Sequence, residues 1–235
     1  MTLDLHAQLR QSLHDLADPV RAEREKRYLK STDQFIGVTV PASKRLAKAV
    51  RREQTDRAFT DVRALAEALW AGEFHEEKRL AVQLFDEYRA SLTPAEWPLL
   101  LTWVREAGSW DLVDEIAAHL LGSMAERYPE YDAEFDSLIQ DCDFWVRRAA
   151  LVSCVVRIRH RTVSASRVCT LCDSLMTDRE YFVRKALGWV LRECATIEPE
   201  YTVPFLRRWA GIAPRMILRE AVRKLEPDQQ QLVLG

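Results

Sequence analysis

A short motif recurs three times in the second half of the chain, and its spacing constrains the fold more than any other feature. Residues 146–150 (VRRAA) match residues 183–187 (VRKAL) and residues 218–222 (LREAV). The shared alanine falls at positions 149, 186 and 221, so neighbouring copies lie 37 and 35 residues apart. A fainter copy, residues 77–81 (EKRLA), lies about two periods upstream. This period accommodates two helices and is typical of HEAT-like repeats, whose units stack into a curved array with a continuous core.

The rest of the sequence favours helices as well. Apolar residues recur at i, i+3, i+4 and i+7, as in Val62, Leu65, Ala66 and Leu69, whereas sustained strand alternation is absent. The 235 residues include only 7 glycines and 9 prolines, so long helices with short connections are expected. We therefore predict an all-α fold of about thirteen helices.

Three positions have the sequence pattern of helix starts. Thr93 is followed by Pro94 and Glu96, which together form the pattern of a capping box. Asp143 and Asp178 each precede an apolar-periodic run, so both are predicted to cap a helix.

Composition and charge limit the functional classes. The net charge is −2, so a nucleic-acid-binding role requires Arg and Lys to gather on one face. No apolar run approaches the roughly 18 residues of a membrane span, and the first residues, Met1–His6, have no apolar signal core. We therefore expect a cytoplasmic protein that does not bind membranes.

Cysteine and histidine give little support for a metal site. Cys169 and Cys172 form a CxxC pattern, which occurs in redox and zinc proteins, but no second pair of ligands lies at matching spacing. We favour buried structural thiols in a reducing compartment, with a metal or redox protein as the alternative. The five histidines are scattered along the chain: His6, His14, His75, His119 and His160.

Each copy of the repeated motif also carries at least one arginine before its alanine: Arg147 and Arg148, Arg184, and Arg219. Projecting from the inner helix of each repeat, such residues would line the concave side with positive charge despite the acidic total. Alternatively, the same side chains would cap or bridge adjacent repeats. The sequence leaves both interpretations open.

Three segments combine aromatic and charged residues: 109–114 (SWDLVD), 144–150 (FWVRRAA) and 184–193 (RKALGWVLRE). Trp110 and Asp114 are four residues apart and share one face of a helix, as do Lys185 and Trp189. Taken singly, a helical Trp is usually part of a core, and an early Asp usually interacts with the helix N-terminus.

Taken together and in order, these segments resemble the AlkD family of DNA alkylation repair glycosylases. The resemblance covers most of the chain and rests on residues 27–30 (RYLK) with 34–41 (QFIGVTVP), 109–114 (SWDLVD), 145–150 (WVRRAA), 185–193 (KALGWVLRE) and 213–221 (APRMILREA). It implies a single domain over residues 1–235, folded as a C-shaped, right-handed solenoid of HEAT-like repeats.

The resemblance also implies roles for individual residues. By position in the motifs, the family's catalytic carboxylate corresponds to Asp114, and its two active-site tryptophans correspond to Trp110 and Trp189. Its phosphate-contacting arginine corresponds to Arg148. Further DNA contacts are expected from Tyr28, Lys30, Lys185, Arg192 and Arg219.

The implied activity is hydrolysis of the N-glycosidic bond of cationic alkylated purines, such as 7-alkylguanine and 3-alkyladenine, in duplex DNA during base excision repair. The family holds the lesion without flipping it. We expect a monomer in the bacterial cytosol that requires neither metal nor cofactor. The main alternative is a catalytically inactive HEAT-like scaffold that binds DNA or protein, because a fold alone does not determine function.

Overall fold

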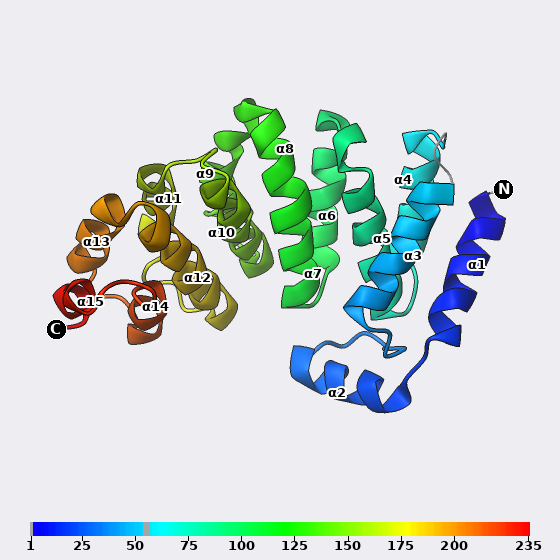
Figure 1. The fold of residues 1–235 in the computed structure, drawn as a ribbon, viewed down its shortest axis with the longest axis horizontal. Coiled ribbons are helices and arrows are strands. Elements are labelled where there is room, and N and C mark those ends of the chain that lie inside the picture. Colours follow the sequence, from blue (N-terminus) through cyan, green and yellow to red (C-terminus); the bar gives the residue numbers. More distant parts are fainter. Residues whose placement is uncertain (1, 54–56) are drawn as a thin grey trace. The chain divides into compact units, whose positions relative to one another are not determined.

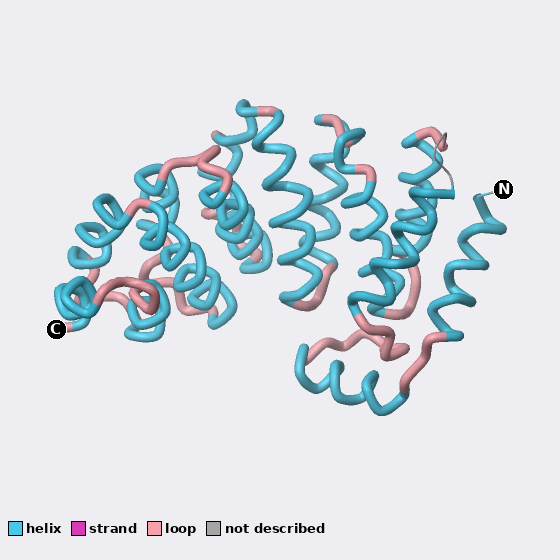
Figure 2. Tube along the Cα trace, in the orientation of Figure 1, coloured by secondary structure: helices cyan, strands magenta, loops and turns pink. Residues whose placement is uncertain are grey.

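The computed structural model describes residues 2–53 and 57–235. These residues form helices joined by turns and contain no β-strand beyond one isolated bridge between Gln34 and Phe74 (Figure 2). The all-α prediction is confirmed. Within these residues, none of the helices combines the length and the apolar character that crossing a membrane requires.

Contacts divide the chain into two compact units. Unit 1 comprises Met1–Leu99 and Glu106–Glu115, and unit 2 comprises Leu100–Arg105 and Ile116–Gly235. The helix α6 (Trp97–Glu106) contributes residues to both.

In unit 1, α5 packs against α3 and α4, and the short helix α2 lies across the ends of its neighbours (Figure 1). The elements are α1 (Thr2–Asp15), α2 (Pro19–Leu29), α3 (Val40–Glu53), α4 (Phe59–Trp70), α5 (His75–Glu87), the 3₁₀ turns η1 (Arg89–Ser91) and η2 (Pro94–Glu96), and α7 (Trp110–Glu115).

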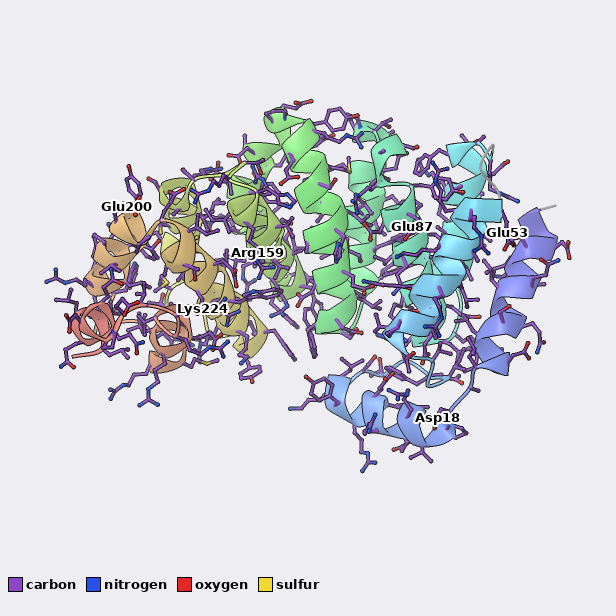
Figure 3. The ribbon with its side chains drawn as sticks, viewed as in Figure 1. Asp18, Glu53, Glu87, Arg159, Glu200 and Lys224 are labelled. Atoms are coloured by element: carbon purple, nitrogen blue, oxygen red, sulfur yellow. The ribbon has the colours of Figure 1, made fainter. Side chains whose placement is uncertain are left out.

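Local sequence explains where these elements begin and which faces they bury. The predicted apolar stripe of α4, from Val62 to Leu69, is completely buried. Asp18, labelled in Figure 3, caps α2 by accepting a hydrogen bond from the Arg21 N–H at 3.0 Å. The predicted capping box is confirmed, because Glu96 accepts from the Thr93 N–H at 2.7 Å and Thr93 accepts in turn from Ala95.

In unit 2, α12 packs between α10 and α14, while α11 and α13 form a second layer against α12 (Figure 1). The elements are the π-helical segment η3 (Ile116–Leu121), α8 (Gly122–Arg127), η4 (Pro129–Asp132), α9 (Glu134–Leu138), α10 (Phe144–Arg159), α11 (Ala165–Asp173), α12 (Tyr181–Ile197), α13 (Pro199–Arg208), α14 (Arg215–Ala221) and α15 (Pro227–Leu234).

Each copy of the repeated motif lies on one of the packed helices α10, α12 and α14. The shared alanines Ala149, Ala186 and Ala221 are all buried, as close helix packing requires. Arg159 near the end of α10, labelled in Figure 3, pairs with Glu193 of α12 at 2.9 Å and links two consecutive copies. This arrangement confirms the helical repeat fold.

Two expectations about the helices need correction: the residue that caps α12 and the number of helices. Asp143 caps α10 as predicted, but Asp178 does not cap α12, which begins at Tyr181 with Glu180 at its N-cap. The Asp178 side chain accepts from the Glu180 N–H at 2.7 Å and so shapes the preceding turn. The described residues form fifteen α-helices rather than about thirteen, partly because η3 separates α7 from α8 within one helical run.

Candidate active site and nucleic-acid interface

The helix α7 presents Trp110 and Asp114 on one face. Leu112 and Val113 are completely buried and fix the helix to unit 1, whereas Trp110 and Asp114 are half-buried and one turn apart. Gly108, with φ +64°, reverses the chain between α6 and α7, a conformation that glycine adopts without strain. The indole and carboxylate therefore share a partly accessible surface, as the spacing predicts.

Tyr28 lies beside this surface. It projects from the last turn of α2, is 70% exposed, and meets Trp110 edge to face, with ring centroids 5.8 Å apart and an interplanar angle of 81°. Lys30, also exposed, ends α2 in the left-handed conformation with φ +54°. The structure thus brings together two aromatic residues that the sequence assigns to separate motifs.

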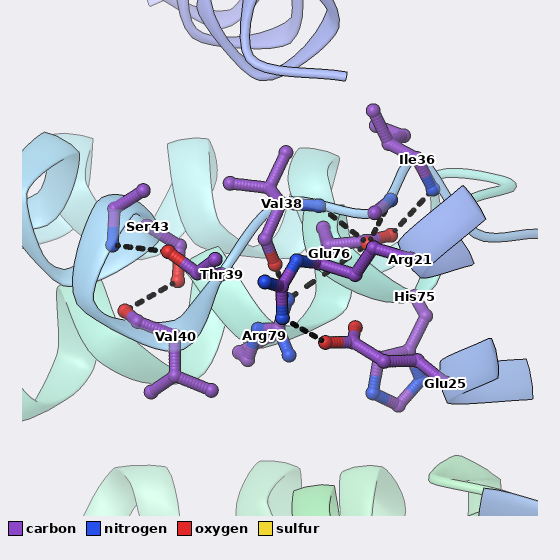
Figure 4. A network of polar contacts seen from close by, with 12 residues as sticks. Arg21, Glu25, Ile36, Val38, Thr39, Val40, Ser43, His75, Glu76 and Arg79 are labelled. Atoms are coloured by element: carbon purple, nitrogen blue, oxygen red, sulfur yellow. Dashed lines mark hydrogen bonds and ion pairs between the residues drawn. The ribbon is translucent and has the colours of Figure 1, made fainter. Parts of the chain in front are cut away.

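The loop that follows α2 is held by a buried carboxylate. Glu76 of α5 accepts hydrogen bonds from the N–H groups of Ile36 (2.9 Å), Gly37 (2.6 Å) and Val38 (3.1 Å), as Figure 4 shows. Gly37 has φ +91°, and a Cβ there would lie 2.0 Å from the Asp18 carbonyl oxygen. The backbone of residues 36–38, within the segment 34–41, therefore has a structural role. It fixes the path of the chain beyond Tyr28.

His75 is a buried histidine in contact with α7 that the sequence did not identify as part of the site. His75, the first residue of α5, has Nε2 2.8 Å from Asp111 Oδ2 and Nδ1 3.4 Å from Asp33 Oδ2. Lys78 also donates to Asp33 at 2.8 Å. The nearest sequence signal is Asp111 inside the SWDLVD motif, but nothing in the spacing connects it to position 75.

The ionisation of this group follows from its contacts. Burial lowers the pKa of His75, but hydrogen bonds to Asp111 and Asp33 outweigh burial, so its pKa lies above 6.5. Burial raises the pKa of both carboxyls, yet the His75 contacts, together with Lys78 at Asp33, hold these pKa values below 3.8. These contacts therefore favour the imidazolium form of His75 and the ionised forms of Asp33 and Asp111.

Glu115 follows Asp114 directly but lies on another face of α7. It is one turn beyond Asp111, and its carboxylate lies 3.9 Å from Lys44 Nζ on α3. Burial raises the pKa of Glu115, opposed by Lys44 and Arg79. The carboxylate on the face of Trp110 is Asp114.

In unit 2, α12 presents Lys185 and Trp189 one turn apart, the first exposed and the second half-buried. Gly188 lies where α14 approaches most closely, since a Cβ there would be 2.8 Å from Glu220 Cβ. Arg192 pairs with Glu220 and, at 3.3 Å, with Glu193. The Arg192 charge is thus largely matched within the protein.

The repeated basic positions mostly bridge neighbouring segments. Arg148 is 5% exposed and donates to the Phe182 carbonyl oxygen on α12. Arg147 pairs with Asp178 at 2.9 Å, and Arg184 donates to the Asp178 carbonyl. The bridging interpretation therefore describes Arg147 and Arg148, whereas Arg184 holds the turn that precedes its own helix. Arg219 on α14 is exposed.

The cysteines are free thiols. Cys169 and Cys172 are both buried, as expected for structural residues, and Cys142 is exposed. Burial raises the pKa of Cys169 to about 12 and that of Cys172 well above 9, which keeps both thiols protonated. Within the described ranges, no three His, Cys, Asp or Glu side chains gather into a group able to hold a metal ion.

Comparisons with known proteins agree with the fold. A predicted DNA alkylation repair enzyme from Enterococcus faecalis is 20% identical and superposes with a TM-score of 0.79 over 90% of this chain and 97% of its own. AlkD2 from Streptococcus mutans is 14% identical, with a TM-score of 0.61 over 87% of this chain and 97% of its own. No curated protein sequence matches the chain. Residues 9–225 match the family described as DNA alkylation repair enzyme, and the chain belongs to this DNA repair family.

Proposed function

We propose that the chain is a DNA glycosylase that hydrolyses the N-glycosidic bond of cationic alkylated purines in duplex DNA. The observation that carries the proposal is the surface of α7, where a partly exposed carboxylate, Asp114, stands one turn from Trp110 with Tyr28 against that indole. A protein that only bound DNA would gain nothing from an anion on a surface that faces phosphates, because the two repel.

The chemistry suits a carboxylate without a strong acid. A 7-alkylguanine or 3-alkyladenine carries a positive charge and leaves as a neutral base, so it needs no protonation. As the bond breaks, positive charge develops on the deoxyribose. Asp114 would stabilise this charge more in the transition state than in the ground state, and would orient the attacking water.

The aromatic residues of the surface would act on the same charge. The electron-rich face of Trp110 attracts a developing cation. Tyr28 meets that indole edge to face and would hold it in a fixed orientation while presenting its own exposed ring to the DNA backbone.

Base flipping is not part of the proposed mechanism. Most glycosylases extrude the target base into a pocket. The residues proposed here grip sugar and phosphate, so the alkylated base would stay largely untouched and bulky adducts would be accepted.

Unit 2 is proposed to contribute Trp189 as the second active-site tryptophan, on the resemblance alone. Lys185 and Arg219 are proposed phosphate contacts, supported by their exposure, as is Lys30 in unit 1. Arg148 and Arg192 are also proposed phosphate contacts on the resemblance. Within the protein, Arg148 donates to the Phe182 carbonyl oxygen and Arg192 pairs with Glu220. We further propose a single domain over residues 1–235 that acts as a monomer in the bacterial cytosol without a metal or cofactor.

The proposal is tested by comparing single-turnover base release from duplexes with 7-methylguanine, 3-methyladenine, uracil or 1,N6-ethenoadenine. The two cationic bases should be released and the two neutral bases should not. A neutral base leaves as an anion and needs a proton, and the proposed mechanism supplies none because it uses Asp114 as the anion that faces the sugar cation.

Each outcome is informative. Comparable rates on 7-methylguanine and uracil would mean that a general acid acts in the site and would contradict the mechanism. Tight binding to every duplex without release of any base would favour a catalytically inactive DNA-binding scaffold.

A further inference from the structure

His75 joins two segments that carry proposed DNA-facing residues. It is completely buried at the start of α5, between the loop that follows α2 and the first turn of α7. One ring nitrogen faces Asp111 and the other faces Asp33, and the Phe35 ring stacks on the imidazole at 4.5 Å with an interplanar angle of 16°. Asp111 directly follows Trp110, and Asp33 lies five residues after Tyr28.

The two contacts define the protonation of the ring. An ionised carboxylate only accepts hydrogen bonds, and a neutral imidazole has one N–H donor and one lone pair. A neutral His75 would therefore direct a lone pair at one of the two carboxylates. Only the imidazolium, with both nitrogens protonated, satisfies Asp33 and Asp111 together.

In this form His75 supplies the cation that contacts Asp111. Asp33 also binds Lys78, so the imidazolium is the hydrogen-bonded cation that matches Asp111. Loss of the His75 proton would remove this charge and leave the ring one N–H, which can donate to Asp111 or to Asp33 but not to both, whereas Asp33 would keep Lys78. Loss of its hydrogen-bonded cation is unfavourable for the largely buried Asp111, although Arg79 still attracts it. The charged groups on the surrounding elements are Asp33 of the loop, Asp111 and Glu115 of α7, Lys78 and Arg79 of α5, Lys44 of α3, and the Arg21–Glu25 pair of α2.

We propose that His75 is a positioning residue whose imidazolium ties Asp111 to Asp33 and thereby holds Trp110 and Tyr28 in mutual contact. It touches neither DNA nor the reacting atoms. Because Asp33 has a second cation, the effect of losing the charge falls mainly on α7, the helix that carries Trp110 and Asp114.

The pH range of the effect follows from the sign of the shift. A group whose pKa is higher in the folded protein than the ordinary 6.5 stabilises the fold fully below 6.5. That stabilisation is lost as the pH rises through the folded-state pKa. Trp110 should therefore be held firmly below pH 6.5 and released as the pH rises through the folded-state pKa of His75.

The first test is ¹⁵N NMR of the His75 ring in the full chain, with the resonances assigned by their loss in His75→Gln. Both ring nitrogens should carry protons below pH 6.5, and the ring should lose one proton in a single step as the pH rises above 6.5. Asp111→Asn should lower the titration midpoint, since an amide can donate to the imidazole lone pair. A single-proton tautomer well below pH 6.5, or a midpoint unchanged by Asp111→Asn, would overturn the proposal.

A second readout follows Trp110 directly. In protein labelled with 5-fluorotryptophan, the ¹⁹F resonance of Trp110, assigned by Trp110→Phe, should shift with the same midpoint as the His75 ring. An indole signal that ignores the His75 titration would contradict the positioning role. Both NMR experiments use the protein without DNA, so they remain decisive even if the protein releases no base. If His75→Gln folds poorly, the comparison of Asp111→Asn with the wild type provides the test.

The activity test rests on the proposed function. His75→Gln should lower the single-turnover rate at neutral pH roughly ten- to hundredfold, as expected for a small misplacement of catalytic groups, with little change in DNA affinity. It should also abolish the loss of rate that the wild type is expected to show as the pH rises through the His75 pKa. His160→Gln is the matched control, because His160 is an exposed histidine that contacts Glu126 at 3.0 Å. An alkaline loss that persists in His75→Gln would overturn the assignment.

Discussion

Replacing Asp114 by asparagine removes the negative charge of α7's accessible face and keeps its size. Asp114 is half-buried, so its surroundings are neither bulk water nor a dry interior, and an effective dielectric constant of about 20 applies. For a developing sugar cation at about 4 Å, the attraction is about 4 kcal/mol.

This energy sets the size of the expected defect. Each 1.36 kcal/mol, approximately, changes the rate tenfold, so loss of the full attraction slows the reaction about a thousandfold. The asparagine dipole recovers part of the stabilisation, which gives an expected range of roughly a hundred- to a thousandfold. DNA affinity should change little, because the cation exists only in the transition state.

The assay is single-turnover release of 7-methylguanine from one duplex, with affinity measured in parallel. Asp61→Asn is the matched control, since Asp61 is an exposed carboxylate on α4 of the same unit, and it should release base at the wild-type rate. Base release by Asp114→Asn within tenfold of the wild type would refute the assignment of the carboxylate.

Three further predictions concern unit 2. Arg219→Ala should weaken binding to damaged and undamaged duplexes alike and lower the salt dependence by about one counterion; loss at one lesion alone would contradict a phosphate contact. Arg148→Ala should weaken binding in the same way and also lower the melting temperature, because the bond to the Phe182 carbonyl is lost; an unchanged melting temperature would contradict that bond's role. Gly188→Ala should destabilise the fold by about 1–3 kcal/mol in urea unfolding, since its methyl group would meet Glu220; unchanged stability would refute the close approach.

The sequence predicted those features that depend on spacing along a helix. The buried stripe of α4, the repeated alanines and the capping box follow from local periodicity and cap chemistry, and all three are found. The shared face of Trp110 and Asp114 follows from their four-residue separation. These features need no knowledge of which helix packs against which.

Features that depend on distant partners could not be predicted in this way. Arg192 is charged at a position that suggests a DNA contact, but its partner Glu220 lies 28 residues away on another helix. His75 and Asp111 are separated by 36 residues, and only the packing of α5 against α7 joins them. A sequence pattern identifies a charged residue, whereas the folded chain determines whether that charge is already matched.

The most direct measurement is mass-spectrometric identification of the products that the pure protein forms from a duplex with a single 7-methylguanine. Hydrolysis of the glycosidic bond predicts free 7-methylguanine and an equal amount of strand with one abasic site, in buffer that contains a metal chelator. An intact modified strand, or a strand demethylated to guanine without base loss, would contradict glycosidic hydrolysis.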